Sequence, residues 1–287
     1  RITGLTPKGY AKAHRGHHMR AALQTAQSSS VTDAAYLSGY EASSSFYKDA
    51  PAMLGMAPEA RLYGFKVLKD SGSGEDAFII KALDQIAELN ERAGKLVIHG
   101  INLSLGGSFD PSVFGCGHTP MCQELRRLWR QGVLVCLAAG NEGYALLDSA
   151  NGAIAANMDL SIGDPANLEE AIAVGSVHKT NPHTYGVSYF SSRGPTADGR
   201  MKPDLVAPGE NILSARHQWP KAKPTVRNAY VQMSGTSMAT PHVAGIAALW
   251  AQASGDRGAA LWQRLITTAR ALPLPVVDCG RGIVQAP

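Results

Sequence analysis

Short runs of apolar residues alternate along most of the chain with longer stretches in which apolar residues recur every three to four positions. The short runs have the length of buried strands, and the longer ones have the period of helices that bury one side. Strands are expected at residues 62–67, 97–103, 133–138, 171–177 and 205–207, and helices at 75–92, 121–131, 237–253 and 257–271. This alternation predicts an α/β fold: a three-layer, doubly wound, mostly parallel sheet with helices on both faces.

Polar residues follow two of the expected strands and open one of the helices. Ser104 and Asn141 come after the runs at 97–103 and 133–138, and Ser237 begins the helix at 237–253. Ligands of open α/β sheets bind beyond the carboxyl ends of the strands, so we expect these three residues to meet there. Residues 107–123 and 144–168 have the character of long loop insertions at the same edge, where they would restrict which substrates enter.

The most informative stretch is GTSMATPHVAG, at residues 235–245. Thr236 and Ser237 are residue types that cap helices, and Pro241 is tolerated in a first turn. The simplest interpretation of such a serine is a cap before a core helix. The position also lies at the positive end of the helix dipole, among free backbone N–H groups, where a nucleophile whose attack creates an oxyanion would be favoured.

These eleven residues resemble the nucleophile motif of the subtilisin-like serine proteases (subtilases), and the resemblance implies that Ser237 is the catalytic nucleophile. The stretch AAGN at 138–141 is similar to the segment that supplies the oxyanion-hole asparagine of the family, which implies that role for Asn141. Further segments resemble the family in the expected order from about Gly55 onward. Residues 55–287 are therefore expected to form a subtilisin-like peptidase domain.

A third match, NLSLGG at 102–107, concerns substrate binding. In subtilases the backbone of this segment pairs with an extended substrate as an added strand, which gives affinity that depends little on sequence. The resemblance implies substrate-binding roles for Ser104, Leu105, Gly106 and Gly107, and for Ala138, Ala139 and Gly140 as the opposite wall of the primary specificity pocket. Small residues on both walls indicate a roomy pocket.

Residues 1–54 form an atypical N-terminal segment, because neither the aspartate motif nor the histidine motif of the family is intact there. Asp33 and Asp49 follow no strand-like run, and no glycine follows either of them. Aligning the chain on Gly-His selects His17 as the general base, whereas aligning on His-x-x-His selects His14. His17 is the candidate that we adopt.

Several alternatives remain open for this segment. His14, His17 and His18 have the i, i+3, i+4 spacing of a metal site, although no Glu or Cys lies nearby to complete one. Asp278, after the apolar residues 275–277, has the form of the missing aspartate motif, as a circular permutation would place it. Three further hypotheses would explain the missing aspartate motif. The first strand would lie upstream of Arg1, the gene start would be altered, or the protein would bind peptides without cutting them.

Composition and charge argue against other classes. The formal net charge of +4 is spread along 287 residues, which disfavours nucleic-acid binding, and no apolar run of about 20 residues could span a membrane. We expect a monomer that needs no cofactor, with a structural calcium ion allowed by the resemblance but assigned by no aspartate-rich loop. No signal peptide opens the chain, so a secreted and a cytoplasmic location both stay open.

The sequence allows a structural prediction for three of the four cysteines. Cys116 and Cys122 flank a short stretch of loop, and their spacing allows a local disulfide without requiring one. Cys136 lies in an expected core strand and should be a buried thiol.

Together these observations predict a serine endopeptidase in which Ser237 attacks the scissile carbonyl, Asn141 holds the oxyanion and His17 moves the proton. The alternative is a truncated or inactive pseudoprotease that binds peptides in the same cleft. An esterase of the α/β-hydrolase type is disfavoured, because its Gly-x-Ser-x-Gly elbow would need glycine where Ala239 stands.

Overall fold

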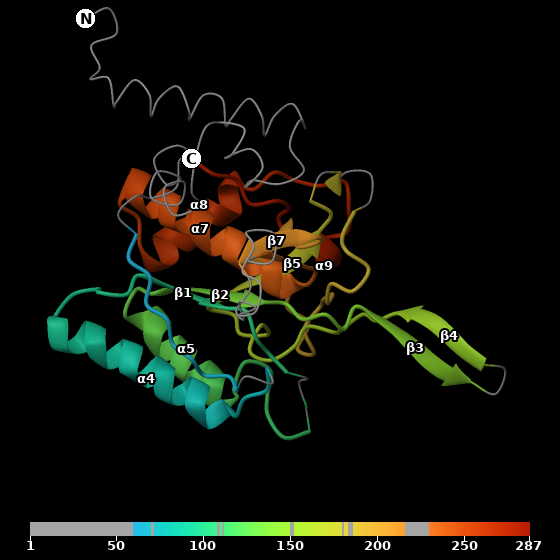
Figure 1. The fold of residues 1–287 in the computed structure, drawn as a ribbon, viewed down its shortest axis with the longest axis horizontal. Helices are drawn as coiled ribbons and strands as arrows, with labels where there is room; N and C mark the ends of the chain where they lie inside the picture. Colours follow the sequence, from blue (N-terminus) through green and yellow to red (C-terminus); the bar gives the residue numbers. More distant parts are fainter. Residues whose placement is uncertain are drawn as a thin grey trace, which may run out of the picture. The chain divides into compact units, whose positions relative to one another are not determined.

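Four parallel strands form the main sheet of the computed structural model (Figure 1). The structure describes residues 60–69, 72–107, 110, 112–149, 152–179, 181–182, 186–215 and 230–287. Contacts divide the chain into two units, Arg1–Arg61 and Leu62–Pro287, and the elements below belong to the second. The strands are β1 (Gly100–Leu103), β2 (Leu134–Ala138), β5 (Ile172–Val177) and β6 (Leu205–Pro208), in the order β1-β2-β5-β6.

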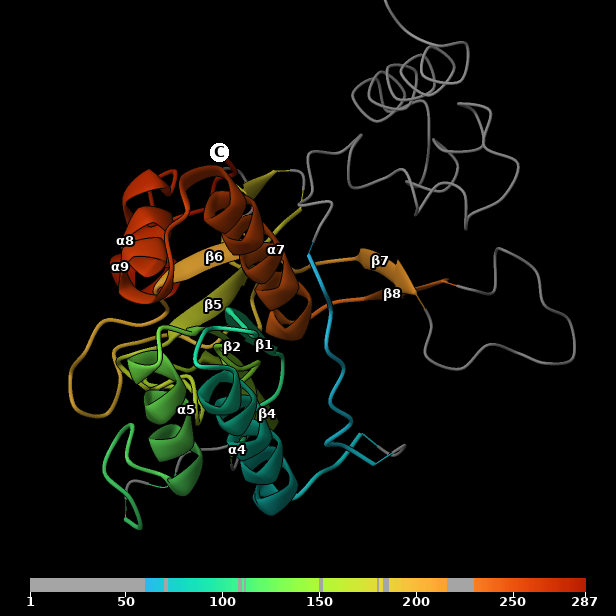
Figure 2. The same ribbon diagram turned by 90° about the vertical axis from the view of Figure 1, so that its left-hand side faces the viewer.

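Helices cover both faces of this sheet, so the expected three-layer arrangement is confirmed (Figures 1 and 2). On one face lie α4 (Asp76–Ala93) and α5 (Pro120–Arg130); on the other lie α7 (Thr236–Ser254) and α8 (Gly258–Thr268). A short helix, α9 (Val276–Cys279), follows α8. The four long helices lie close to the ranges that the apolar periodicity predicts.

The strand β2 shows how the sequence builds the two cores. All five of its residues are buried, as expected for a parallel strand that is covered on both sides. Val135 and Leu137 belong to the apolar cluster beneath α4 and α5, whereas Leu134 and Cys136 belong to the cluster beneath α7 and α8. Because side chains alternate along a strand, one continuous apolar run fills both cores.

The prediction of a strand at residues 62–67 is wrong. Its residues adopt no strand conformation, and only Leu68, just beyond it, forms an isolated bridge with Gly74. Leu62 is 97% exposed, although Phe65 and Val67 pack against the core. A strand requires a neighbour to complete its hydrogen-bond ladder. No such neighbour lies within the part of the chain that the structure describes, where β1 is an outer strand of the sheet.

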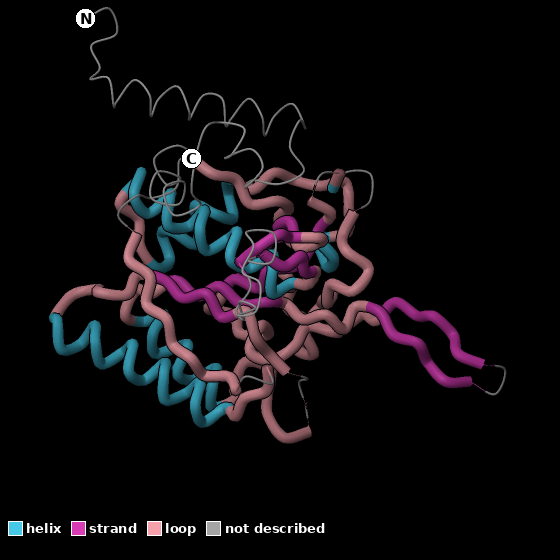
Figure 3. Tube along the Cα trace, in the orientation of Figure 1, coloured by secondary structure: helices cyan, strands magenta, loops and turns pink. Residues whose placement is uncertain are grey.

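The stretch 144–168, expected as a loop insertion, contains a β-hairpin instead. Strands β3 (Tyr144–Ser149) and β4 (Gly152–Asn157) pair antiparallel over six residues each and extend away from the main sheet (Figure 3). Exposed Leu146, Leu147 and Ile154 face solvent on this hairpin. A second pair, β7 (Ile212–Ala215) with β8 (Tyr230–Met233), was also missed from the sequence. The sequence at 107–123 is a loop only up to Thr119, where α5 is capped.

The cysteines are free thiols in the structure, so the local disulfide between Cys116 and Cys122 is not formed. Cys122 is buried in the first turn of α5, where desolvation raises its pKa to about 12, despite a hydrogen bond with Thr119 that lowers it. Cys136 is a buried thiol, as expected. Among the described helices, none is long and apolar enough to cross a membrane.

Candidate active site

Ser237 lies at the second position of α7, with its side chain at the carboxyl edge of the sheet. The N-cap is Gly235, and no side chain caps the helix, so the expected capping by Thr236 or Ser237 is wrong. Both residues are already inside the first turn, and Pro241 lies deeper in the helix than expected. The Ser237 N–H, so close to the helix start, has no carbonyl partner within the helix. Its hydroxyl donates to the Ser104 carbonyl at 3.1 Å.

The side-chain amide of Asn141 is oriented by Thr236. The Thr236 backbone N–H donates to Asn141 Oδ1 at 2.9 Å, and the Thr236 hydroxyl lies 3.1 Å from the same oxygen. A backbone N–H can be accepted only by the oxygen of the amide, so these contacts fix which way the amide faces. Asn141 Nδ2 donates to no described residue, and it is therefore available as a donor on the side away from Thr236.

Thr236 joins the two loops that carry these groups. Its side chain is fully buried, and its hydroxyl lies within hydrogen-bond distance of the Gly140 carbonyl (3.2 Å) and of the Gly140 N–H (3.3 Å). The helix start and the loop after β2 are thereby locked together. The sequence predicted only a capping role for Thr236, because nothing local to it indicates a contact with residues 95 and 96 positions away.

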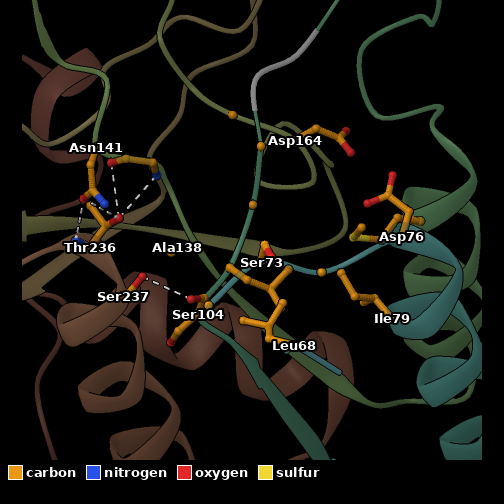
Figure 4. A pocket seen from close by; sticks show the side chains of 18 of the residues that line it. Leu68, Ser73, Asp76, Ile79, Ser104, Ala138, Asn141, Asp164, Thr236 and Ser237 are labelled. Carbon is orange, nitrogen blue, oxygen red and sulfur yellow. Dashed lines mark hydrogen bonds between the residues drawn. The ribbon is translucent and has the colours of Figure 1, made fainter. Parts of the chain in front are cut away.

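A cleft of about 530 Å³ extends from Ser237 along the edge of the sheet (Figure 4). Among the residues implied from the sequence, those that line it are Ser104, Leu105, Gly106, Gly107, Ala138, Gly140, Asn141 and Ser237. Ala139 does not line it, because it is fully buried and its backbone is engaged by Val174 and Gly163. Ser104 and Ser237, which lie 133 positions apart in the sequence, therefore meet at one cavity.

Gly106 is required at the floor of the cleft by a close backbone approach. A Cβ at this position would lie 2.8 Å from the Asp164 carbonyl oxygen, which is closer than Cβ atoms approach other heavy atoms in proteins. The neighbouring Gly107 exchanges backbone hydrogen bonds of 2.9 and 3.0 Å with Asp164. This isolated bridge holds Asp164 against the floor, and Gly163 and Asp164 form a wall of the cleft.

The described lining carries three charged residues, Asp76, Glu142 and Asp164, and all of them are acidic. Asp164 accepts hydrogen bonds from the Thr119 hydroxyl at 3.0 and 3.2 Å. Burial raises the pKa of Asp164 above its usual range, against the lowering effect of these bonds. No periodic or motif signal marks Asp76 and Asp164 as cleft residues in the sequence, and we did not predict them.

The base and the orienting carboxylate are the remaining parts of such a site. His14, His17, His18, Asp33 and Asp49 all lie outside the described residues. No histidine lines the described part of the cleft. Asp278 lies in the short helix α9 and forms an ion pair with Arg193 at 3.7 Å, so it does not occupy a strand end as the permutation hypothesis requires.

Metal binding is not indicated by the described residues, where no three His, Cys, Asp or Glu side chains are grouped to hold an ion. The allowed structural calcium stays a prediction. The cleft instead offers a hydroxyl, an oriented amide donor and exposed strand-edge backbone, which suit the binding and attack of a carbonyl group.

The structure combines a three-layer α/β fold with a serine near a helix start and an oriented asparagine beside it. This combination is that of the subtilisin-like class of proteins. The family model described as the Subtilase family matches residues 16–282. The chain belongs to the subtilase family. Its family match begins at Gly16, within the segment that we expected to be atypical.

Named relatives agree with this assignment. The chain is 38% identical over 213 residues to serine protease AprX of Bacillus subtilis, covering 70% of this chain and 44% of that protein. It is 35% identical over 197 residues to subtilisin DY of Bacillus licheniformis, covering 69% and 56%. It thus spans about half the length of these relatives. The solved structure of Sphericase superposes with a TM-score of 0.61 at 29% identity, over 80% of this chain and 70% of that one.

Proposed function

We propose that this chain is a serine endopeptidase that hydrolyses peptide bonds in peptide or protein substrates. The observation that carries the proposal is the oriented amide of Asn141. Thr236 holds Oδ1, so Nδ2 is the donor presented next to Ser237. An oriented donor beside a hydroxyl nucleophile is what stabilisation of a tetrahedral oxyanion needs, since no reorganisation is then required during the reaction.

In the proposed mechanism Ser237 Oγ forms a bond to the scissile carbonyl carbon and gives its proton to His17. The carbonyl oxygen becomes an oxyanion, which Asn141 Nδ2 and the Ser237 N–H stabilise. Collapse of this intermediate breaks the C–N bond, and His17 returns the proton to the leaving amine. Water then attacks the acyl-enzyme by the same route in reverse, which frees the second product and restores the Ser237 hydroxyl.

His17 is supported as the base by the extent of the family match, which begins one residue before it. A base of this kind must come within hydrogen-bond reach of Ser237 Oγ. In the described structure that hydroxyl donates to the Ser104 carbonyl instead, and it would have to give up this hydrogen bond to donate to an imidazole.

One observation favours the second candidate, a peptide-binding pseudoprotease. The Ser237 proton is directed to a backbone carbonyl, and no histidine is among the described residues that line the cleft. In that case the cleft would bind extended peptides by strand addition without activating the serine.

A fluorophosphonate probe followed by peptide mapping separates the two. An activated Ser237 becomes labelled, and Ser237→Ala abolishes both labelling and turnover of an internally quenched peptide. His17→Ala should then suppress labelling, while His14→Ala and His18→Ala serve as matched controls that retain it. A folded sample without labelling at Ser237 would refute the proposed enzyme and leave the pseudoprotease.

A further inference from the structure

The far end of the cleft from Ser237 is built from aliphatic walls with two carboxylates among them. Leu68, Ile79 and Met121 line this part together with Asp76 and Asp164. Figure 4 shows the Asp76 and Asp164 side chains on the opposite side of the cavity from Ser237 and Asn141. The two carboxylates are near enough for the charge of Asp76 to affect the titration of Asp164.

Neither carboxylate has a cationic partner among the described residues. Asp164 is held by neutral groups, the Thr119 hydroxyl and the Cys122 thiol, and Asp76 forms no ion pair there. Asp76 is exposed at the first position of α4, where the helix dipole favours a negative charge. The described lining of the cleft is therefore locally acidic on a chain whose formal net charge is +4.

An uncompensated acidic pair inside an aliphatic groove matches a particular side-chain chemistry. Lysine and arginine have an apolar stem that packs on aliphatic surface and a cationic tip that needs carboxylates. Asp164 is held in place by Thr119, so its carboxylate is already oriented for a charge-assisted hydrogen bond. A neutral or anionic side chain in this place would leave two carboxylates facing each other.

We propose that Asp76 and Asp164 select a lysine or arginine side chain of the substrate, at a residue other than the one that occupies the primary pocket beside Ala138 and Gly140. The inference rests on the proposed function for its substrate class, an extended peptide paired with residues 104–107. It makes the chain a peptidase with a basic requirement at a site remote from the scissile bond.

The test is a set of internally quenched peptides in which one position at a time carries arginine, lysine, glutamine, leucine or glutamate. At one position remote from the cleaved bond, the arginine or lysine peptide should have a kcat/KM about tenfold above that of the glutamine peptide. The reason is that glutamine cannot form the charge-assisted hydrogen bond with the two carboxylates. Asp76→Asn and Asp164→Asn should each reduce that ratio, and Asp76→Lys, which places a lysine beside the remaining Asp164 carboxylate, should abolish it.

The control variant is Asp148→Asn, which removes the same charge from the exposed hairpin and should keep the preference. Asp164→Asn disturbs a half-buried network, so Asp76→Lys, at an exposed helix start, provides a test that does not depend on it. A cation preference that is absent, or unchanged in Asp76→Lys, overturns the proposal.

A binding measurement keeps this test separate from that of the proposed function. In the Ser237→Ala variant, fluorescence anisotropy reports the affinity of labelled peptides without any turnover. Arginine-dependent binding that Asp76→Lys abolishes supports the acidic pair even where the wild-type chain cleaves nothing. Equal binding of the arginine and glutamine peptides contradicts it, whatever the activity.

Discussion

Asn141 allows the proposed oxyanion site to be tested apart from the structure that supports it. Asn141→Ala removes both the Nδ2 donor and the Oδ1 acceptor of the Thr236 N–H. Asn141→Asp keeps an oxygen in the position of Oδ1 but replaces the donor by a second oxygen. Comparing the two substitutions separates the loss of the donor from the loss of the anchor.

The structure sets different magnitudes for the two effects. Thr236 is fully buried, so Asn141→Ala leaves its N–H without this acceptor and should lower the free energy of unfolding by about 1–3 kcal/mol. Asn141→Asp should leave it nearly unchanged. Losing one oxyanion donor costs about 100- to 1,000-fold in kcat, a general range that includes a subtilisin, and both variants should show it. KM should change little, because the donor acts on the transition state.

The assay measures kcat and KM on an internally quenched peptide, together with urea unfolding of each variant. Fluorophosphonate labelling of Ser237 controls for an intact nucleophile. If both variants label and keep kcat within about threefold of the parent chain, far below the loss expected of an oxyanion donor, the assignment of Asn141 is refuted.

Three further predictions concern stability and the cleft floor. Lys202→Met should destabilise by about 3–5 kcal/mol in urea unfolding, because the buried Lys202 ammonium pairs with the Asp204 carboxylate at 2.6 Å; a loss below about 1 kcal/mol would contradict this. Gly106→Ala should raise KM and lower stability in urea unfolding, because its Cβ would clash with backbone, whereas Gly107→Ala, with open space around its Cβ, should leave stability unchanged. Burial opposes ionisation of Asp198, but hydrogen bonds from a threonine and an arginine prevail and lower its pKa to about 2. Its contribution to stability is therefore complete above the unfolded pKa near 4 and is lost as pH falls toward 2, so Asp198→Asn should destabilise at pH 5 and lose this effect at pH 2.

Local sequence patterns were sufficient for the helices and for four of the expected strands. The alternation of apolar runs with helical periods predicted the parallel sheet and its two covered faces, and β2 fills both cores because every residue in it is apolar. The segment at 62–67 has equally good strand composition, but no described neighbour pairs with it. Strand formation depends on a partner, which a local pattern cannot reveal.

The sequence by itself determined the class of fold and the identity of the reactive candidates, because these depend on periodicity and on short motifs that are contiguous in the chain. Ser237, Asn141 and the segment 104–107 each carry a local signal. Only the tertiary structure decided that Thr236 locks the Asn141 amide and that the backbone at Asp164 lies against Gly106. It also placed two carboxylates, neither of which forms an ion pair with a described residue, in the same cleft as the serine. These are relations between residues far apart in the chain, and they follow from how the loops at the carboxyl edge pack, for which no single stretch of sequence carries a signal.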